Sequence, residues 1–124
     1  MNFKINQITP LLLVRELGEA IAFYVRQLDF TLAFRYDDFY AGIEKDGYSI
    51  HLKTDYDTTK TQTTRSSDEQ VDLLFSVGDV TAVFAEISKR NIEIVQPLRE
   101  MPYGKEFYIA DPDGYVIAFV GSVH

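Results

Sequence analysis

Residues 107–117 read FYIADPDGYVI, and this stretch decides the fold. Its centre, Asp111-Pro-Asp-Gly114, predicts a tight turn, because proline presets φ and glycine permits a positive φ. The apolar residues on either side predict a strand before the turn and another after it. The segment Asp113-Gly-Tyr-Val-Ile117 also matches Asp46-Gly-Tyr-Ser-Ile50, which lies 67 positions earlier. The end of the chain therefore repeats a pattern from its first half.

A second match strengthens the repeat. Val14-x-Glu-Leu17 corresponds to Val77-x-Asp-Val80 at an offset of 63. Each match opens a segment in which apolar residues recur at spacings of 3 and 4, as on one face of an amphipathic helix. Those positions are Leu17, Ala20, Ile21 and Tyr24 and, 63 residues later, Val80, Val83, Phe84 and Ile87. Two matches in the same order predict a tandem βαβββ repeat.

The remaining pattern completes an α+β fold of two modules. Aromatic and β-branched runs predict strands at 8–14, 30–36, 39–44, 48–53, 71–77, 92–95, 106–110 and 115–120, and the first helix is expected over 17–28. Residues 54–70 are polar, contain six threonines and have the composition of a linker. We therefore expect a single domain over residues 1–124, built of modules 1–53 and 71–124.

Composition excludes several function classes. The chain has no cysteine, so disulfides, thiolate metal ligands and thiol nucleophiles are ruled out. Its net charge of −7, without a basic cluster, argues against nucleic acid as a partner. No signal peptide and no apolar stretch of about 20 residues is present, so we expect a cytoplasmic protein with no membrane partner.

The repeat and several phrases together resemble the vicinal oxygen chelate superfamily, which includes glyoxalase I, extradiol dioxygenases, and fosfomycin and bleomycin resistance proteins. The matching phrases are Val14-Arg-Glu-Leu17, Ala22-Phe-Tyr24, Leu28-Asp-Phe30, Tyr103-Gly104 and Phe107–Gly114. The resemblance covers nearly the whole chain outside the linker. It implies the glyoxalase/bleomycin resistance fold, in which the modules form a cupped mixed sheet and two of them enclose a pocket.

The resemblance also implies where a metal would bind. In metal-using members the ligands come from the first and last strands of each module, at positions that here look like Thr9, His51, Asp72 and Ala118. The repeat pairs Thr9 with Asp72 and His51 with Ala118 at the same offsets, so we expect the four to face one cavity. His51 and Asp72 alone carry good donors, and the family pattern usually places a glutamate at position 118. The prediction is therefore no metal and no cofactor, with a divalent metal held by His51 and Asp72 as the alternative.

Further residues are candidates for the pocket. If Ile50 and Leu52 pack under the helices, alternation along the strand turns His51 toward the cup. A pair of His51 and Asp72 would satisfy both groups and could form a catalytic dyad for general-base chemistry. The other expected ligand contacts are a cation near a strand end and three aromatic residues, namely Arg35, Tyr40, Tyr103 and Tyr108.

The resulting prediction is a small-molecule binding protein of the bleomycin resistance type, without a metal. Abundant aromatic residues and an acidic balance suit an aromatic or cationic compound, sequestered between modules. One alternative is a lyase, isomerase or dioxygenase that uses His51 or a reduced metal site, and another is an interaction domain with no ligand. We expect a homodimer, and the polar linker makes exchange of modules between chains easy.

Overall fold

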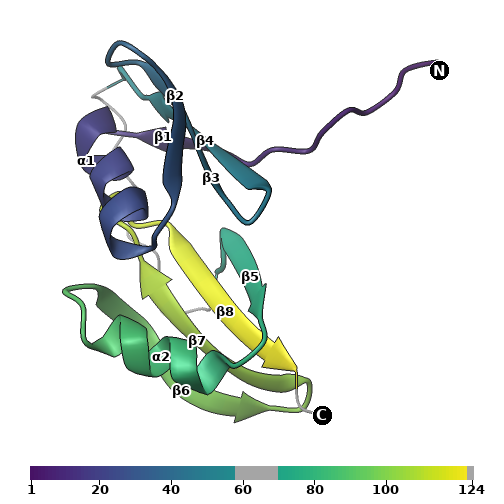
Figure 1. Cartoon of the computed structure of the whole chain (residues 1–124), viewed down its shortest axis with the longest axis vertical. Coiled ribbons are helices and arrows are strands. Elements are labelled where there is room, and N and C mark those ends of the chain that lie inside the picture. The colour runs from purple at the N-terminus through teal and green to yellow at the C-terminus, as the bar shows by residue number, and fades with distance from the viewer. Residues whose placement is uncertain (58–69, 123–124) are drawn as a thin grey trace. The chain divides into compact units, whose positions relative to one another are not determined.

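The computed structural model describes residues 1–57 and 70–122, and these form two compact units, one on each side of residues 58–69. The first unit contains β1 (Leu11–Val14), α1 (Leu17–Ala22), the π-helical turn η1 (Phe23–Gln27), β2 (Thr31–Tyr36), β3 (Tyr40–Lys45) and β4 (Tyr48–Thr54). The second contains β5 (Leu73–Val77), α2 (Val80–Ser88), β6 (Glu93–Met101), β7 (Gly104–Ala110) and β8 (Val116–Ser122) (Figure 1). Most of the predicted linker 54–70 lies outside the described residues.

The two units share one topology, which confirms the predicted α+β fold of tandem βαβββ modules. Their sheets have the strand orders β1-β4-β3-β2 and β5-β8-β7-β6, and the first pair of each is parallel. Leu11 pairs with His51 in one sheet, and Leu74 pairs with Ala118 in the other. These partners keep the offsets of 63 and 67 found in the sequence. The repeat therefore extends to the register of the strands.

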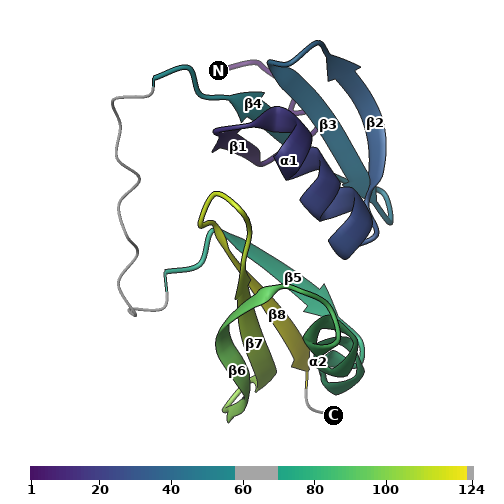
Figure 2. The ribbon, with the colours of Figure 1, turned by 90° about the vertical axis from the view of Figure 1, so that its left-hand side faces the viewer.

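Among the described residues each unit has one α-helix, which covers one face of its sheet (Figure 2). In the first unit α1 contacts β3 and β4, and the predicted apolar positions Leu17, Ala20, Ile21 and Tyr24 are buried. The Glu16 carboxylate accepts hydrogen bonds from the backbone N–H groups of Gly18 and Glu19, which caps the start of the helix. In the second unit α2 contacts β6, β7 and β8. We call the face opposite each unit's own helix the helix-free face of its sheet.

The first predicted helix ends differently from the expectation. A single α-helix was predicted over 17–28, but the chain changes to a π-helical turn at Phe23. Over one turn, apolar spacing does not separate the two helix types, so the sequence pattern could not distinguish them.

The first predicted strand is shorter than expected. It begins at Leu11, whereas the apolar run suggested residue 8. The Pro10 carbonyl accepts a hydrogen bond from the His51 N–H at 2.9 Å, but proline has no N–H to donate to the ladder. Thr9 therefore precedes the strand.

The strand predicted at 92–95 is longer than expected and extends from Glu93 to Met101. Its pairing with β7 shifts register on either side of Gln96, next to Pro97. An edge strand tolerates such bulges and a proline, because one of its sides has no ladder to complete.

The deciding turn has the predicted structure. The Asp111 carboxylate oxygen Oδ1 accepts hydrogen bonds from the N–H groups of Asp113 and Tyr115, both at 2.9 Å, and Gly114 has φ 85°. In the equivalent turn of the first unit, Asp46 and Gly47 have φ 53° and 85°. Two consecutive residues with positive φ between β3 and β4 match the geometry of a tight hairpin turn.

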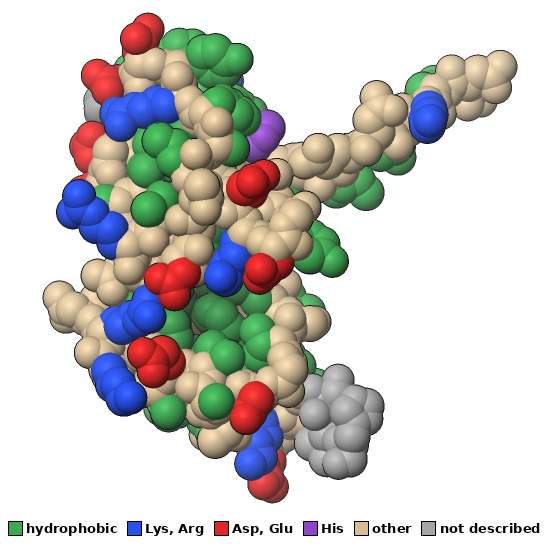
Figure 3. All heavy atoms as spheres, in the orientation of Figure 1, with side chains coloured by type: hydrophobic (Ala, Val, Ile, Leu, Met, Phe, Trp, Pro, Cys, Tyr) green, Lys and Arg blue, Asp and Glu red, His purple; other side chains and the backbone are tan. Residues whose placement is uncertain are grey.

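Charge is spread rather than gathered on the face drawn in Figure 3, where acidic and basic side chains lie interspersed with hydrophobic ones. Within residues 1–57 and 70–122, no helix is long and apolar enough to cross a membrane. The acidic excess therefore marks no site on that face.

Candidate functional site

The helix-free face of the first sheet is aromatic, and strand register explains why. Gly42 pairs with Phe34 on one side and with His51 on the other, so the three lie in one row across β2, β3 and β4. A Cβ at Gly42 would lie 2.3 Å from Cε1 of Phe34, which means that the phenyl ring lies directly over the glycine. The absence of a side chain at position 42 therefore lets the Phe34 ring lie flat against the sheet.

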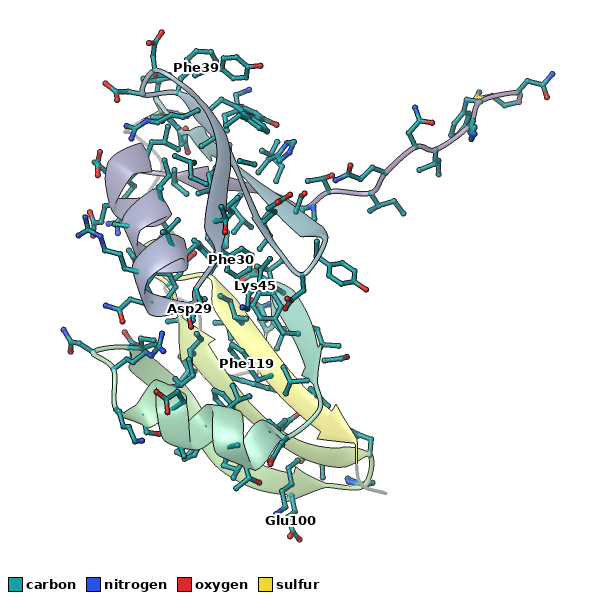
Figure 4. The ribbon with its side chains drawn as sticks, viewed as in Figure 1. Asp29, Phe30, Phe39, Lys45, Glu100 and Phe119 are labelled. Carbon is teal, nitrogen blue, oxygen red and sulfur yellow. The ribbon has the colours of Figure 1, made fainter. Side chains whose placement is uncertain are left out.

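Around this row lies an aromatic cluster that consists of Phe34, Tyr36, Phe39, Tyr40 and His51. The Phe34 and Tyr40 rings are nearly parallel with centroids 6.1 Å apart, and both meet the His51 ring edge-on, at 5.3 and 5.4 Å. Tyr36 and Phe39 continue the cluster toward the β2–β3 turn, where Figure 4 labels Phe39. These two side chains are 60% and 44% exposed. Exposed aromatic surface of this extent is what a flat apolar ligand can cover.

His51 is half-buried and has a partner in its own unit. Ile50 and Leu52 are buried, and His51 points to the opposite face of β4. The Tyr40 hydroxyl and His51 Nδ1 are 2.8 Å apart, in hydrogen-bond contact. Tyr40, one of the residues expected in the pocket, is thus joined to His51 by both ring packing and a hydrogen bond.

Asp72 also has a partner in its own unit. Its N–H donates to the Val116 carbonyl, and its Oδ2 accepts from the Val116 N–H, both at 2.8 Å. This reciprocal pair joins the start of β8 to the residue that precedes β5. The predicted dyad of His51 and Asp72 stays a prediction, because the two residues belong to different units.

The other two predicted cavity positions are poor ligands. The Thr9 hydroxyl accepts a hydrogen bond from the Gln7 side-chain amide at 2.8 Å, and Ala118 is 1% exposed and packs with Tyr108 and Val116. The described residues contain no group of three or more His, Cys, Asp or Glu that could hold a metal ion. A catalytic metal typically takes about three protein ligands, and the four positions supply two suitable donors. This donor set does not fit a catalytic metal centre.

Arg35 is engaged in the β2–β3 turn. Its Nε donates to the Asp37 carbonyl at 2.8 Å, and its Nη2 donates to the Asp38 carboxylate at 3.0 Å. These contacts tie the guanidinium to the turn, so a direct role of Arg35 in ligand binding stays a prediction.

The second sheet carries a polar network on its helix-free face, which we call the Glu106 cluster. It consists of Arg99 from β6, Tyr103 from the β6–β7 turn, and Glu106 and Tyr108 from β7. Arg99 donates to Glu106 Oε2 from Nε at 2.9 Å and from Nη2 at 2.6 Å. The Tyr103 hydroxyl donates to Oε1 at 2.5 Å, and Arg99 Nη2 also donates to the Tyr108 hydroxyl at 3.3 Å.

Sequence reasoning found the two tyrosines of this cluster but missed Glu106 and Arg99. A signal for Glu106 was present, because it is the one charged residue of the predicted strand 106–110, and the structure shows it 2% exposed. Such a group requires a partner. The partner itself could not be read from the pattern, because the register shifts in β6 decide that position 99 lies opposite Glu106.

The cluster sets the protonation of its members. Burial alone would raise the pKa of Glu106, but hydrogen bonds from the two tyrosines and Arg99 outweigh it and lower the pKa below the usual 4.5. The hydrogen bond to Glu106 raises the pKa of Tyr103 to about 12. Burial, followed by the interaction with Glu106, also raises the pKa of Tyr108. At neutral pH the cluster therefore holds a carboxylate, a guanidinium and two neutral phenols.

We expect Tyr103 to titrate near pH 12, and Glu106→Gln to return its pKa toward the ordinary 10.0, because the carboxylate that holds the phenol proton is gone. Tyrosine-selective NMR across the alkaline range measures this pKa, and Tyr103→Phe assigns the signal. A midpoint that stays near 12 in Glu106→Gln would show that the carboxylate is not the cause.

A scan of family models matches residues 4–119 to the Glyoxalase/Bleomycin resistance protein/Dioxygenase superfamily. Among solved structures, TioX from Micromonospora sp. ML1 is similar at 18% identity and TM-score 0.76, over 95% of this chain and 99% of that one. TnmS3, an antibiotic binding protein from Streptomyces sp. CB03234, is similar at 21% identity and TM-score 0.75, over 98% and 100%. The bleomycin-binding protein from Streptomyces verticillus, solved with copper(II)-bleomycin, has 21% identity and TM-score 0.72, over 98% and 100%. A search of curated proteins gave no significant match.

Proposed function

This chain belongs to the Glyoxalase/Bleomycin resistance protein/Dioxygenase superfamily, and from that premise we propose that it is a small-molecule binding protein that holds an aromatic compound without a resident metal. The observation that carries the proposal is the aromatic cluster on the helix-free face of the first sheet. Fold alone does not assign a function in this superfamily, so the argument rests on the side chains.

The aromatic cluster has the properties of a binding wall. It combines the exposed rings of Tyr36 and Phe39 with the half-buried rings of Phe34, Tyr40 and His51. A flat ligand that covers such rings gains apolar burial and about 1 kcal/mol for each well-placed aromatic pair. The Tyr40–His51 hydrogen bond adds a polar point that can orient the ligand.

Two further observations support the proposal, the first for the absence of a resident metal and the second for small-molecule binding. The four positions that correspond to metal ligands supply two suitable donors, which is fewer than a catalytic centre needs. The neighbours TnmS3 and the bleomycin-binding protein are described as binders of antibiotics, and they share the fold over nearly the whole chain. These similarities support small-molecule binding as the class of function. Which ligand binds would depend on the side chains of this chain.

An enzyme of the lyase, isomerase or dioxygenase type is the second candidate, and the Tyr40–His51 contact is the observation that favours it. A histidine hydrogen-bonded to a phenol can take and return a proton at a bound substrate.

The expected homodimer and the exchange of modules between chains stay predictions.

We expect Tyr36→Ala to weaken binding of neutral naphthamide, a flat aromatic probe, by about tenfold, because one exposed ring of the wall is lost. Calorimetric titration measures the affinity. Tyr48→Ala is the matched control, because Tyr48 is 78% exposed but points to the helix side of the same sheet, as Ile50 and Leu52 do. Equal losses in both variants, or no binding by the wild-type protein, would contradict the proposal.

A further inference from the structure

Within the part of the chain that the structure describes, the His51 side chain uses one of its two ring nitrogens. Nδ1 lies 2.8 Å from the Tyr40 hydroxyl, and the imidazole makes no other hydrogen bond to the described residues. Among those residues no buried polar side-chain atom lacks a hydrogen-bond partner. The second nitrogen, Nε2, is therefore not buried and reaches the surface of the helix-free face.

The contact with Tyr40 decides which nitrogen of His51 carries the proton. A neutral imidazole has one N–H donor and one accepting nitrogen. A phenol O–H is a stronger donor than an imidazole N–H, and the imidazole nitrogen is a stronger acceptor than the phenol oxygen, so the Tyr40 hydroxyl donates to Nδ1. The proton of the neutral ring then lies on Nε2. His51 therefore presents an N–H donor to the helix-free face.

This N–H lies among apolar groups of the first unit. On one side the rings of Phe34 and Tyr40 meet the His51 ring edge-on, at 5.3 and 5.4 Å. On the other side Leu11 of β1 pairs with His51 and is 50% exposed. Because Leu12 is buried, alternation along β1 places Leu11 on the helix-free face. A flat ligand that covers these groups also removes the N–H from water.

Removing the N–H from water costs free energy unless the ligand accepts its hydrogen bond. A donor that is buried without an acceptor weakens binding by about tenfold. A carbonyl oxygen in the plane of an aromatic compound can accept the bond while the ring system covers the aromatic cluster. The position of His51 therefore discriminates between flat ligands that have an acceptor and those that have none.

We propose that the His51 Nε2–H is the donor that selects the ligand of the aromatic cluster, so that the protein prefers flat aromatic compounds with a neutral carbonyl oxygen over compounds without an acceptor. The inference rests on the proposed function, because it names the ligand class of the same site. All the groups that carry it belong to the first unit, and the donor needs no charge.

The test compares two neutral probes of nearly the same shape, acetylnaphthalene and isopropenylnaphthalene. The second replaces the carbonyl oxygen with a methylene group and cannot accept a hydrogen bond. We expect the wild-type protein to bind acetylnaphthalene about tenfold more tightly. Fluorescence titration in mildly alkaline buffer measures the ratio of the two dissociation constants.

Two variants locate the donor. His51→Phe keeps a flat ring but removes the N–H, so the preference should be lost, and isopropenylnaphthalene should bind at least as tightly as to the wild-type protein. Lys53→Met is the control, because Lys53 is an exposed donor two residues along β4 on the same face and pairs with Tyr40. We expect Lys53→Met to keep the preference.

A measurement on the wild-type protein guards against a change in folding. Heteronuclear NMR distinguishes the protonated ring nitrogen from the accepting one, and His124→Gln assigns the signals, because the chain has two histidines. We expect the proton of neutral His51 on Nε2. Acetylnaphthalene should shift the Nε2 signal more than isopropenylnaphthalene does.

The outcomes separate this inference from the proposed function. Equal binding of the two probes by the wild-type protein, with weaker binding of both in Tyr36→Ala, would overturn the role of His51 and keep the function. A proton on Nδ1, a preference that survives in His51→Phe, or a preference that is lost in Lys53→Met would also overturn that role. Absence of binding for both probes would overturn the inference and the proposed function together.

Discussion

Replacing Phe107 with alanine should lower the free energy of unfolding by about 4 kcal/mol. Phe107 is 0% exposed and lies under α2. Its ring stacks on that of Phe119 with centroids 4.7 Å apart and meets that of Phe84 at 5.0 Å. The truncation removes apolar burial and leaves a cavity that the paired strands β7 and β8 cannot close. Chemical denaturation followed by circular dichroism measures the loss.

The control for this experiment is Phe39→Ala, which removes the same ring from a position that is 44% exposed. We expect it to cost less than about 1 kcal/mol, because a partly exposed ring leaves no closed cavity. A loss below about 1.5 kcal/mol for Phe107→Ala would mean that the aromatic stack is not the centre of the second unit.

Replacing Glu106 with glutamine should lower the free energy of unfolding by about 3 kcal/mol. The substitution keeps the shape of the side chain but removes the charge that Arg99 faces at 2.6 Å. It also weakens the acceptor of the Tyr103 hydroxyl. Denaturation at neutral pH measures the effect. Glu100→Gln, an identical change at an exposed position of the neighbouring strand, should stay within about 0.5 kcal/mol of the wild-type value.

A double variant separates the ion pair from simple packing. Arg99→Met/Glu106→Gln should be more stable than Glu106→Gln alone, because it no longer leaves a partly buried cation without its anion. Additive losses in the two single variants would show that Arg99 and Glu106 do not stabilise each other.

The difference in free energy of unfolding between the wild-type protein and Glu106→Gln should decrease at acidic pH. The pKa of Glu106 is lower in the folded protein than the ordinary value of 4.5, so the carboxylate stabilises the fold above that pH. This contribution is lost as the pH falls through the folded-state pKa. The gap between the wild-type protein and Glu106→Gln should therefore narrow below pH 4.5 and stay constant between neutral pH and that value.

Local sequence predicted the secondary structure well where apolar spacing or turn chemistry gave a clear signal. The apolar spacing of Leu17, Ala20 and Ile21 and the turn chemistry of Asp111-Pro-Asp-Gly114 each match the structure, and the offsets of 63 and 67 reappear as strand pairs. The first strand and its helix were less well predicted, because Pro10 and the π-helical turn act through hydrogen bonds that apolar spacing does not encode.

The candidate site was likewise predicted only in part. The alternation of Ile50 and Leu52 placed His51 on the helix-free face, but the Tyr40 contact depends on which residues of β3 and β4 are opposite. Asp72 was predicted as a pocket residue, and the structure shows its carboxylate bound to the Val116 N–H. Backbone partners of this kind cannot be seen from residue type.

The sequence by itself determined the repeat and the composition of each sheet face, because both follow from residue identity at fixed spacing. The tertiary structure decided which polar groups meet: Tyr40 with His51, and Arg99 with Glu106. The physical reason is register. A shift of one residue in a strand reverses which face every side chain occupies, and the bulges of β6 that bring Arg99 to Glu106 form only when the sheet is assembled.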